Sequence, residues 1–190
     1  YGQFNVQMIK DKPVYFTGVV KTDSSVELQL VTDKNNIVCD YLVQTIITND
    51  DHLAALFANL SIVDDIDKRL FLAAYVALKS INDDNSHHLL VYANCRENAD
   101  KIIDYAKMLL RLAYFTIPEL HTSSYHSEMR KLERNTTLDS FKTSRYGIIS
   151  CVYCLGEGWD FPLLDGVVFA ENMTSNIRIV QSALRASRKN

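Results

Sequence analysis

Long apolar runs are absent from this sequence, and so is any excess of positive charge. No stretch reaches the roughly 20 apolar residues that a membrane-spanning helix needs, and no signal peptide opens the chain, so we expect no membrane partner. Twenty Lys and Arg stand against 23 Asp and Glu, a net charge of −3, so any contact with nucleic acid has to come from a local patch. At 190 residues, the chain is long enough to bury a core without disulfides or metals.

A metal-binding pattern is also lacking. Cys151 and Cys154 are spaced C-x-x-C, which fits zinc or redox chemistry, but no second ligand pair lies at the spacing of a zinc site. Both fall in the apolar stretch 147–155, which predicts a strand, so we interpret them as buried structural thiols in a reducing, intracellular compartment. The histidines show no H-x-x-x-H or H-E-x-x-H spacing, and we expect the adjacent His87 and His88 to be exposed.

Glycine occurs only six times, and no glycine-rich phosphate loop is found. The sequence has neither G-x-x-x-x-G-K-[ST] nor a G-x-G-x-x-G after a strand, and no acidic magnesium box or G-x-S-x-G elbow. We therefore expect this chain alone not to hydrolyse ATP. Because it begins at Tyr1 and stops in a basic cluster, we expect it to be a piece of a longer protein.

Strand and helix patterns alternate along most of the chain. Helices are predicted at 51–60, 64–81, 96–112, within 127–141 and at 175–187, and strands at 88–93, 119–125, 147–153 and 166–170. Near-continuous apolar strands alternating with helices predict an α/β fold, a parallel sheet with helices on both faces.

The first part of the chain follows a different pattern. Strand candidates at 14–20 and 26–31 predict a hairpin, so we interpret residues 1–36 as a short β-rich connector or the end of a preceding lobe. A further strand candidate at 37–47 opens the main domain, which we place at 37–190.

Ligands of parallel sheets bind where strands end, so the loops at 94–96, 126–128, 155–162 and 171–174 are the place to look for a site.

Three segments carry a resemblance to a known family. His88–Asp100 is a strand, a polar turn and a helix; Leu155-Gly-Glu-Gly-Trp-Asp-Phe-Pro162 follows a strand; and Gln181-Ser-Ala-Leu-Arg-Ala-Ser-Arg188 lies on the last predicted helix. Together they resemble motifs IV, V and VI of superfamily 2 helicases, over residues 36–190. The resemblance implies the second, C-terminal RecA-like lobe of a DEAD/DEAH-like helicase. The Gln-Ser-Ala-Leu-Arg variant looks like helicases of large DNA viruses and restriction-type enzymes.

The third segment implies a catalytic role in ATP hydrolysis. By resemblance, Arg188 is the arginine finger that stabilises the γ-phosphate in the transition state, with Arg185 contacting phosphate or bracing the interface. Three positions apart on a helix, both can face one site, and Gln181 would hydrogen-bond within the nucleotide cleft. The alternative is a solvated basic helix end, which the helix dipole also favours.

The second segment implies contacts to both ligands. Asp160 resembles the acid that links the nucleotide ribose to the arginine helix, and Gly158 suits a backbone that turns close to a ligand. Gly156 and Glu157 would lie beside the nucleic-acid backbone, and Trp159 is interpreted as packing. The alternative is an ordinary turn.

The strand exits supply candidate phosphate contacts. Asn94, Arg96 and Ser127 are our choices, contacts that carry no base information. Arg96 can equally be a surface residue at a helix start. Three further cations are interpreted as solvated helix charges: Arg130, Lys131 and Arg134.

Two functions from different classes follow. The first is one lobe of a helicase or translocase on DNA or RNA, with ATP and Mg held mainly by a missing first lobe, in cis or on another chain. The second is a degenerate lobe acting as a nucleic-acid-binding or scaffold module. Leu184, where the family usually has glycine, and the acidic total favour the second. The first is favoured by the retained motif residues Asp160, Gln181, Arg185 and Arg188. A flavodoxin-like or receiver-like domain lacks any supporting phosphate loop or acid cluster.

Overall fold

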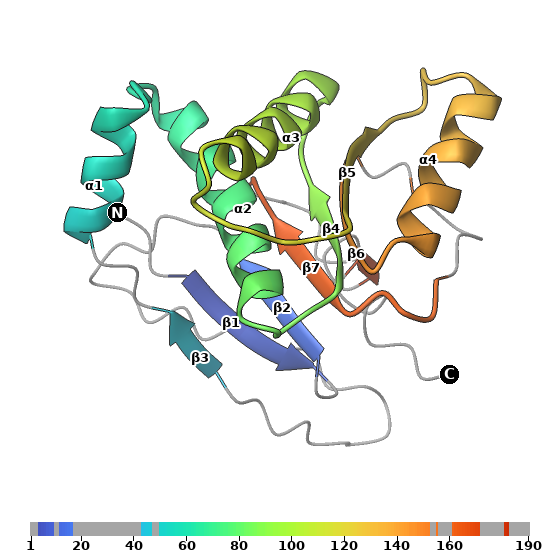
Figure 1. The fold of residues 1–190 in the computed structure, drawn as a ribbon, viewed down its shortest axis with the longest axis horizontal. Coiled ribbons are helices and arrows are strands. Elements are labelled where there is room, and N and C mark those ends of the chain that lie inside the picture. The colour runs from blue at the N-terminus through green and yellow to red at the C-terminus, as the bar shows by residue number, and fades with distance from the viewer. Residues whose placement is uncertain are drawn as a thin grey trace.

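The structure is a computed structural model that describes residues 4–9, 12–16, 43–46, 50–152, 155, 161–171 and 181–182, with side chains described from residue 54 onward. The elements are β1 (Phe4–Ile9), β2 (Lys12–Phe16), β3 (Val43–Ile46), α1 (Asp50–Asn59), α2 (Asp65–Asn82), β4 (His88–Tyr92), α3 (Arg96–Arg111), β5 (Leu120–Tyr125), α4 (Lys131–Thr143), β6 (Tyr146–Cys151) and β7 (Gly166–Phe169) (Figure 1). The predicted strand at 26–31 lies outside the described residues, as does the predicted helix 175–187 except for two helical residues, Gln181 and Ser182.

One sheet runs through the molecule, in the order β3-β1-β2-β7-β4-β6-β5. The neighbours β7, β4, β6 and β5 are all parallel, which confirms the predicted α/β fold. On the other side of β7, β2 pairs parallel to it and β1 pairs antiparallel with both β2 and β3. Strands from the predicted connector thus continue the sheet, and the domain boundary at residue 36 stays a prediction.

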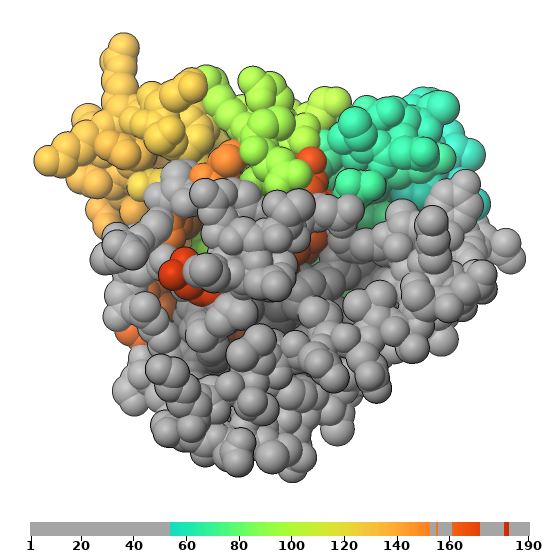
Figure 2. All heavy atoms as spheres, turned by 180° about the vertical axis from the view of Figure 1, so that it is seen from behind, coloured from blue at the N-terminus to red at the C-terminus, as the bar shows by residue number. Residues whose placement is uncertain are grey.

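Both faces of the parallel strands are covered. Successive residues of β4 enter different cores, because side chains alternate along a strand. Leu89 and Val91 join the core beneath α2 and α3, whereas Leu90 and Tyr92 join a second core that contains Phe141 of α4. In the back view, α4 and the α1–α2 pair lie at opposite ends of the upper row of helices, with α3 between them (Figure 2). This burial explains why the strands are apolar throughout.

The boundaries of α2 follow from local chemistry. At its start, the Asp64 carboxylate accepts a hydrogen bond from the Ile66 backbone N–H at 3.1 Å, and Asp65 and Asp67 occupy the first turn, where the helix dipole favours anions. At its end, Lys79 pairs with Asp83 at 2.6 Å. The prediction of a helix at 64–81 is confirmed to within one residue at each end.

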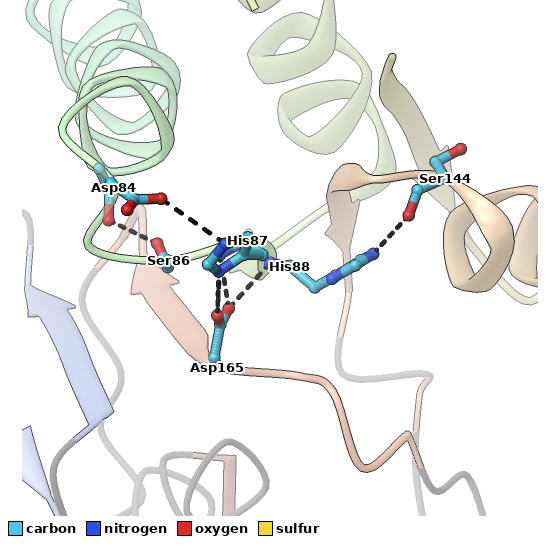
Figure 3. A network of polar contacts seen from close by, with 7 residues as sticks. Asp84, Ser86, His87, His88, Ser144 and Asp165 are labelled. Atoms are coloured by element: carbon cyan, nitrogen blue, oxygen red, sulfur yellow. Dashed lines mark hydrogen bonds and ion pairs between the residues drawn. The ribbon is translucent and has the colours of Figure 1, made fainter. Parts of the chain in front are cut away.

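The starts of β4 and β7 are joined by Asp165. Its carboxylate accepts hydrogen bonds from the backbone N–H groups of His87 and His88, both at 2.8 Å, and contacts His87 Nδ1 at 3.1 Å (Figure 3). Asp84 lies on the other side of the same imidazole, 3.6 Å from Nε2. The polar network therefore holds two sheet neighbours in register at their amino ends.

The prediction that both histidines are exposed is wrong for His88. Its residue exposure is 4%, and its ring lies edge-on against Phe141 at 5.1 Å and Phe161 at 5.0 Å. Burial lowers its pKa, and a hydrogen bond to the Ser144 carbonyl opposes that effect. Because the His88 ring and Phe141 lie against Gly147, a Cβ there would come within 2.5 Å of the Phe141 ring.

No helix in the described part of the chain is both long and apolar enough to cross a membrane.

Candidate nucleic-acid interface

The four parallel strands end at one edge of the sheet, and polar loops follow three of them. β4 leads into Asn94–Arg96, β5 into His126–Glu128, and β7 into Glu171. This is the edge at which parallel sheets bind ligands. The contacts between these loops determine what the edge can bind.

The side chain of Glu171, which follows β7, lies at the N-terminal end of α3. Its Oε2 accepts a hydrogen bond from the Asn94 backbone N–H at 2.6 Å, and its Oε1 accepts one from the Asn98 side-chain amide at 2.8 Å. The N-cap residue, Cys95, makes no side-chain capping bond, so the buried carboxylate of Glu171 provides the negative charge that the helix start favours. Glu171 therefore has a structural role at this edge: it holds the start of α3 against the end of β7.

The same helix start affects a second acid. Hydrogen bonds from its own backbone N–H and from the Cys95 side chain hold the pKa of Glu97 below its usual range. An exposed carboxylate in the first turn of α3 thus stays ionised under ordinary conditions. The edge therefore has two anions at the helix start, Glu97 and Glu171.

Arg96 connects the loops after β4 and β5. Its Nη1 donates to Glu128 Oε2 at 2.6 Å, and its Nε lies 3.6 Å from Asp100 Oδ2, one turn further along α3. The other oxygen of Asp100 accepts a hydrogen bond from the Ser124 hydroxyl on β5. The guanidinium, half exposed, therefore lies between two carboxylates from different elements.

The structure places all three predicted phosphate contacts at this edge. Asn94 is exposed but its backbone N–H is engaged by Glu171, and Ser127 is exposed next to Glu128. Sequence reasoning missed Glu171, Asn98 and Glu128, since their partners lie far along the chain. It also missed Asp100, although the i,i+4 spacing from Arg96 on the same helix was an available signal. An acidic residue directly after an apolar strand was the one available signal for Glu171.

The predicted nucleotide-site residues cannot be placed in the same way. Gln181 is helical and exposed, and Ser182 beside it is buried. The others lie outside the described residues: Gly156, Glu157, Gly158, Asp160, Arg185 and Arg188.

The predicted thiols are half described. Cys151 is a free cysteine, fully buried on β6, which agrees with a structural role, and Cys154 lies outside the described residues. Among the side chains that the structure describes, no group of three His, Cys, Asp or Glu is arranged to hold a metal ion.

Comparison with known proteins adds an independent observation. A family model described as "Helicase conserved C-terminal domain" matches residues 68–190, more than half of the chain. A sequence search found no matching curated protein.

Three solved structures resemble this fold. "Mss116p DEAD-box helicase domain 2 bound to an RNA duplex" has a TM-score of 0.53 at 16% identity, covering 65% of this chain and 46% of that one. The S. cerevisiae Dbp5 C-terminal domain bound to Gle1 and IP6 has 0.46 at 15%, covering 62% and 65%. The C-terminal part of the Fun30 ATPase domain has 0.47 at 17%, covering 74% and 46%. The chain spans less than half of the first and third structures.

Proposed function

Because the chain belongs to the helicase conserved C-terminal domain family, we propose that it works as the second RecA-like lobe of a nucleic-acid-dependent ATPase of the helicase or translocase type. The observation that carries the proposal is the meeting of the Asn94–Arg96 loop with the Ser127–Glu128 loop at the carboxyl edge of the parallel sheet. Because the Arg96–Glu128 contact joins the two loops, their exposed polar groups lie where one strand backbone can meet both.

On the nucleic-acid side, Asn94, Arg96 and Ser127 contact phosphates, and Gly156 and Glu157 lie along the same backbone. Such contacts fix the position of a strand without reading its bases, so the lobe accepts DNA or RNA sequences broadly. An RNA duplex is bound in the Mss116p structure, which supports nucleic acid as the partner class.

On the nucleotide side, a first RecA-like lobe, in cis or on another chain, holds ATP and Mg. Closure brings Arg188 onto the γ-phosphate as the arginine finger, with Arg185 beside it. Gln181, Gly158 and Asp160 complete the cleft from this side. Gln181 is exposed on its helix, as a residue that faces another lobe requires.

A degenerate lobe that binds nucleic acid or scaffolds a complex without ATPase activity is the second candidate. Two observations favour it. Leu184 stands where the family pattern has glycine, and carboxylates surround Arg96.

Three finer points also remain predictions: the viral or restriction-type origin, the domain boundary at residue 36 and an intracellular location.

The test uses the assembled protein with its first lobe. R188A should abolish nucleic-acid-stimulated ATP hydrolysis, while R111A, which removes an exposed arginine from the last turn of α3, should leave turnover unchanged. Circular dichroism of both variants checks that the fold is intact. Unchanged turnover in R188A refutes the finger assignment, and strand binding without any turnover in the unmodified protein supports the scaffold.

A further inference from the structure

The two carboxylates that hold Arg96 differ in their freedom to move. Asp100 lies on the same helix as Arg96, one turn further along, and its second oxygen is engaged by Ser124 of β5. Glu128 lies in the turn after β5, its side chain is 70% exposed, and Arg96 at 2.6 Å is its one hydrogen-bond or ion-pair partner among the described residues. Asp100 is therefore fixed in place, and Glu128 is free to rotate into solvent.

A strand phosphate cannot simply be added to this arrangement. One guanidinium and two carboxylates give the cluster a net charge of −1, which repels a phosphate as long as both carboxylates stay. The phosphate also needs the guanidinium N–H groups on the side that Glu128 now occupies, because arginine binds phosphate best through two parallel hydrogen bonds. One carboxylate has to leave, and only Glu128 can leave without breaking a second hydrogen bond.

We propose that Glu128 is an intramolecular substitute for the strand phosphate: it occupies Arg96 in the absence of nucleic acid and is displaced by a phosphodiester on binding. Asp100 remains in contact and orients the guanidinium in both states. This inference rests on the proposed function, since it requires Arg96 to be a phosphate contact. It adds a residue that sets how strongly the lobe binds a strand and how easily it releases it.

The expected effect is moderate. Exposed ion pairs of this kind are weak, so removing the competitor should tighten strand binding about two- to five-fold. The displaced Glu128 also regains a cation from solution, which offsets part of the counterion release that drives phosphate binding. Without that carboxylate, affinity should fall more steeply with salt.

The experiment measures fluorescence anisotropy of a labelled single-stranded oligonucleotide with the full protein, first lobe included, over a series of salt concentrations. E128Q removes the competing charge and keeps the side chain's size. E133Q is the matched control, because Glu133 is an exposed acid in the first turn of α4, in the adjoining helix, and has no ion pair among the described residues. R96A and R96A/E128Q complete a double-mutant cycle.

We expect E128Q to bind about two- to five-fold tighter than the unmodified protein and E133Q to change affinity less. In the R96A background, E128Q should have no more effect than E133Q. If R96A weakens binding but E128Q and E133Q behave alike, the competition is refuted and the proposed function stands. If R96A leaves affinity unchanged, or if the unmodified protein binds no strand, the assignment of Arg96 fails, and this inference fails with it.

Discussion

Replacing Glu171 by alanine should destabilise the protein more than any exposed acid at the same edge. The substitution removes the carboxylate that accepts hydrogen bonds from the Asn94 backbone N–H at 2.6 Å and from the Asn98 amide at 2.8 Å. Hydrogen bonds to a charged group contribute about 1.5–3 kcal/mol each, and the favourable charge at a helix start adds about 0.3–1 kcal/mol. Because these contributions are not additive, we expect E171A to lose about 2–4 kcal/mol of unfolding free energy.

The assay is urea unfolding followed by circular dichroism, with hydrogen exchange of the Asn94 amide as a local readout. E128A is the control, since its ion pair is exposed and should contribute less than about 1 kcal/mol. E171A should also make the Asn94 amide exchange faster. Amides in β6 should lose no more protection than the overall fall in unfolding free energy accounts for. A loss below about 0.5 kcal/mol, or an unchanged Asn94 amide, would refute the role of Glu171 in holding the start of α3.

Two further predictions concern the core at the amino end of the strands. G147A should destabilise the protein by about 1–3 kcal/mol, because the added Cβ would lie 2.5 Å from the Phe141 ring in a closely packed core. Urea unfolding measures this loss of stability, and an unchanged stability would contradict the packing at Gly147. Stability should also fall with acid, because burial lowers the pKa of His88 and the unfolded chain therefore binds the proton first. The contribution of His88 to stability is fully present above the unfolded pKa, about 6.5. That contribution decreases as the pH falls from there through the folded pKa. Unfolding from pH 8 to pH 5 should show this decrease, and H88F should reduce its slope; a slope equal to that of the unmodified protein would show that His88 does not cause it.

The sequence predicted most elements of the fold because each has its own local pattern. The helix expected at 96–112 is α3 at Arg96–Arg111, and the strand expected at 88–93 is β4 at His88–Tyr92. Apolar periodicity and turn residues determine such boundaries without reference to the rest of the chain. The order of the strands in the sheet, with β4 between β6 and β7, depends on long-range pairing and was not predicted.

The sequence-based predictions that failed did so because they depend on contacts between residues far apart in the chain. His88 looked exposed because a histidine at the start of a strand is polar, and the two phenylalanines that bury it come from the end of α4 and the segment before β7. Likewise, Arg96 and Ser127 could be assigned to the ligand edge from the rule for parallel strands, but the contact of Arg96 with Glu128 could not. Glu128 follows a different strand, and a local pattern holds no information about which loop it meets.

These pairings also change how the acidic total should be interpreted. A net charge of −3 seemed to oppose nucleic-acid binding, yet the acids at the carboxyl edge do not act equally on an approaching phosphate. Glu171 is buried against the positive end of α3, and Asp100 is bonded to Ser124 and orients Arg96, so both charges serve to position other groups. Glu128 is exposed and its partner is the guanidinium itself, so its negative charge can be moved away when a phosphate arrives. Glu97, exposed beside Arg96 in the first turn of α3, keeps its negative charge at this edge. Strand binding therefore depends on the local charges around Arg96 with Glu128 displaced, and the total charge of the chain is not evidence against a nucleic-acid partner.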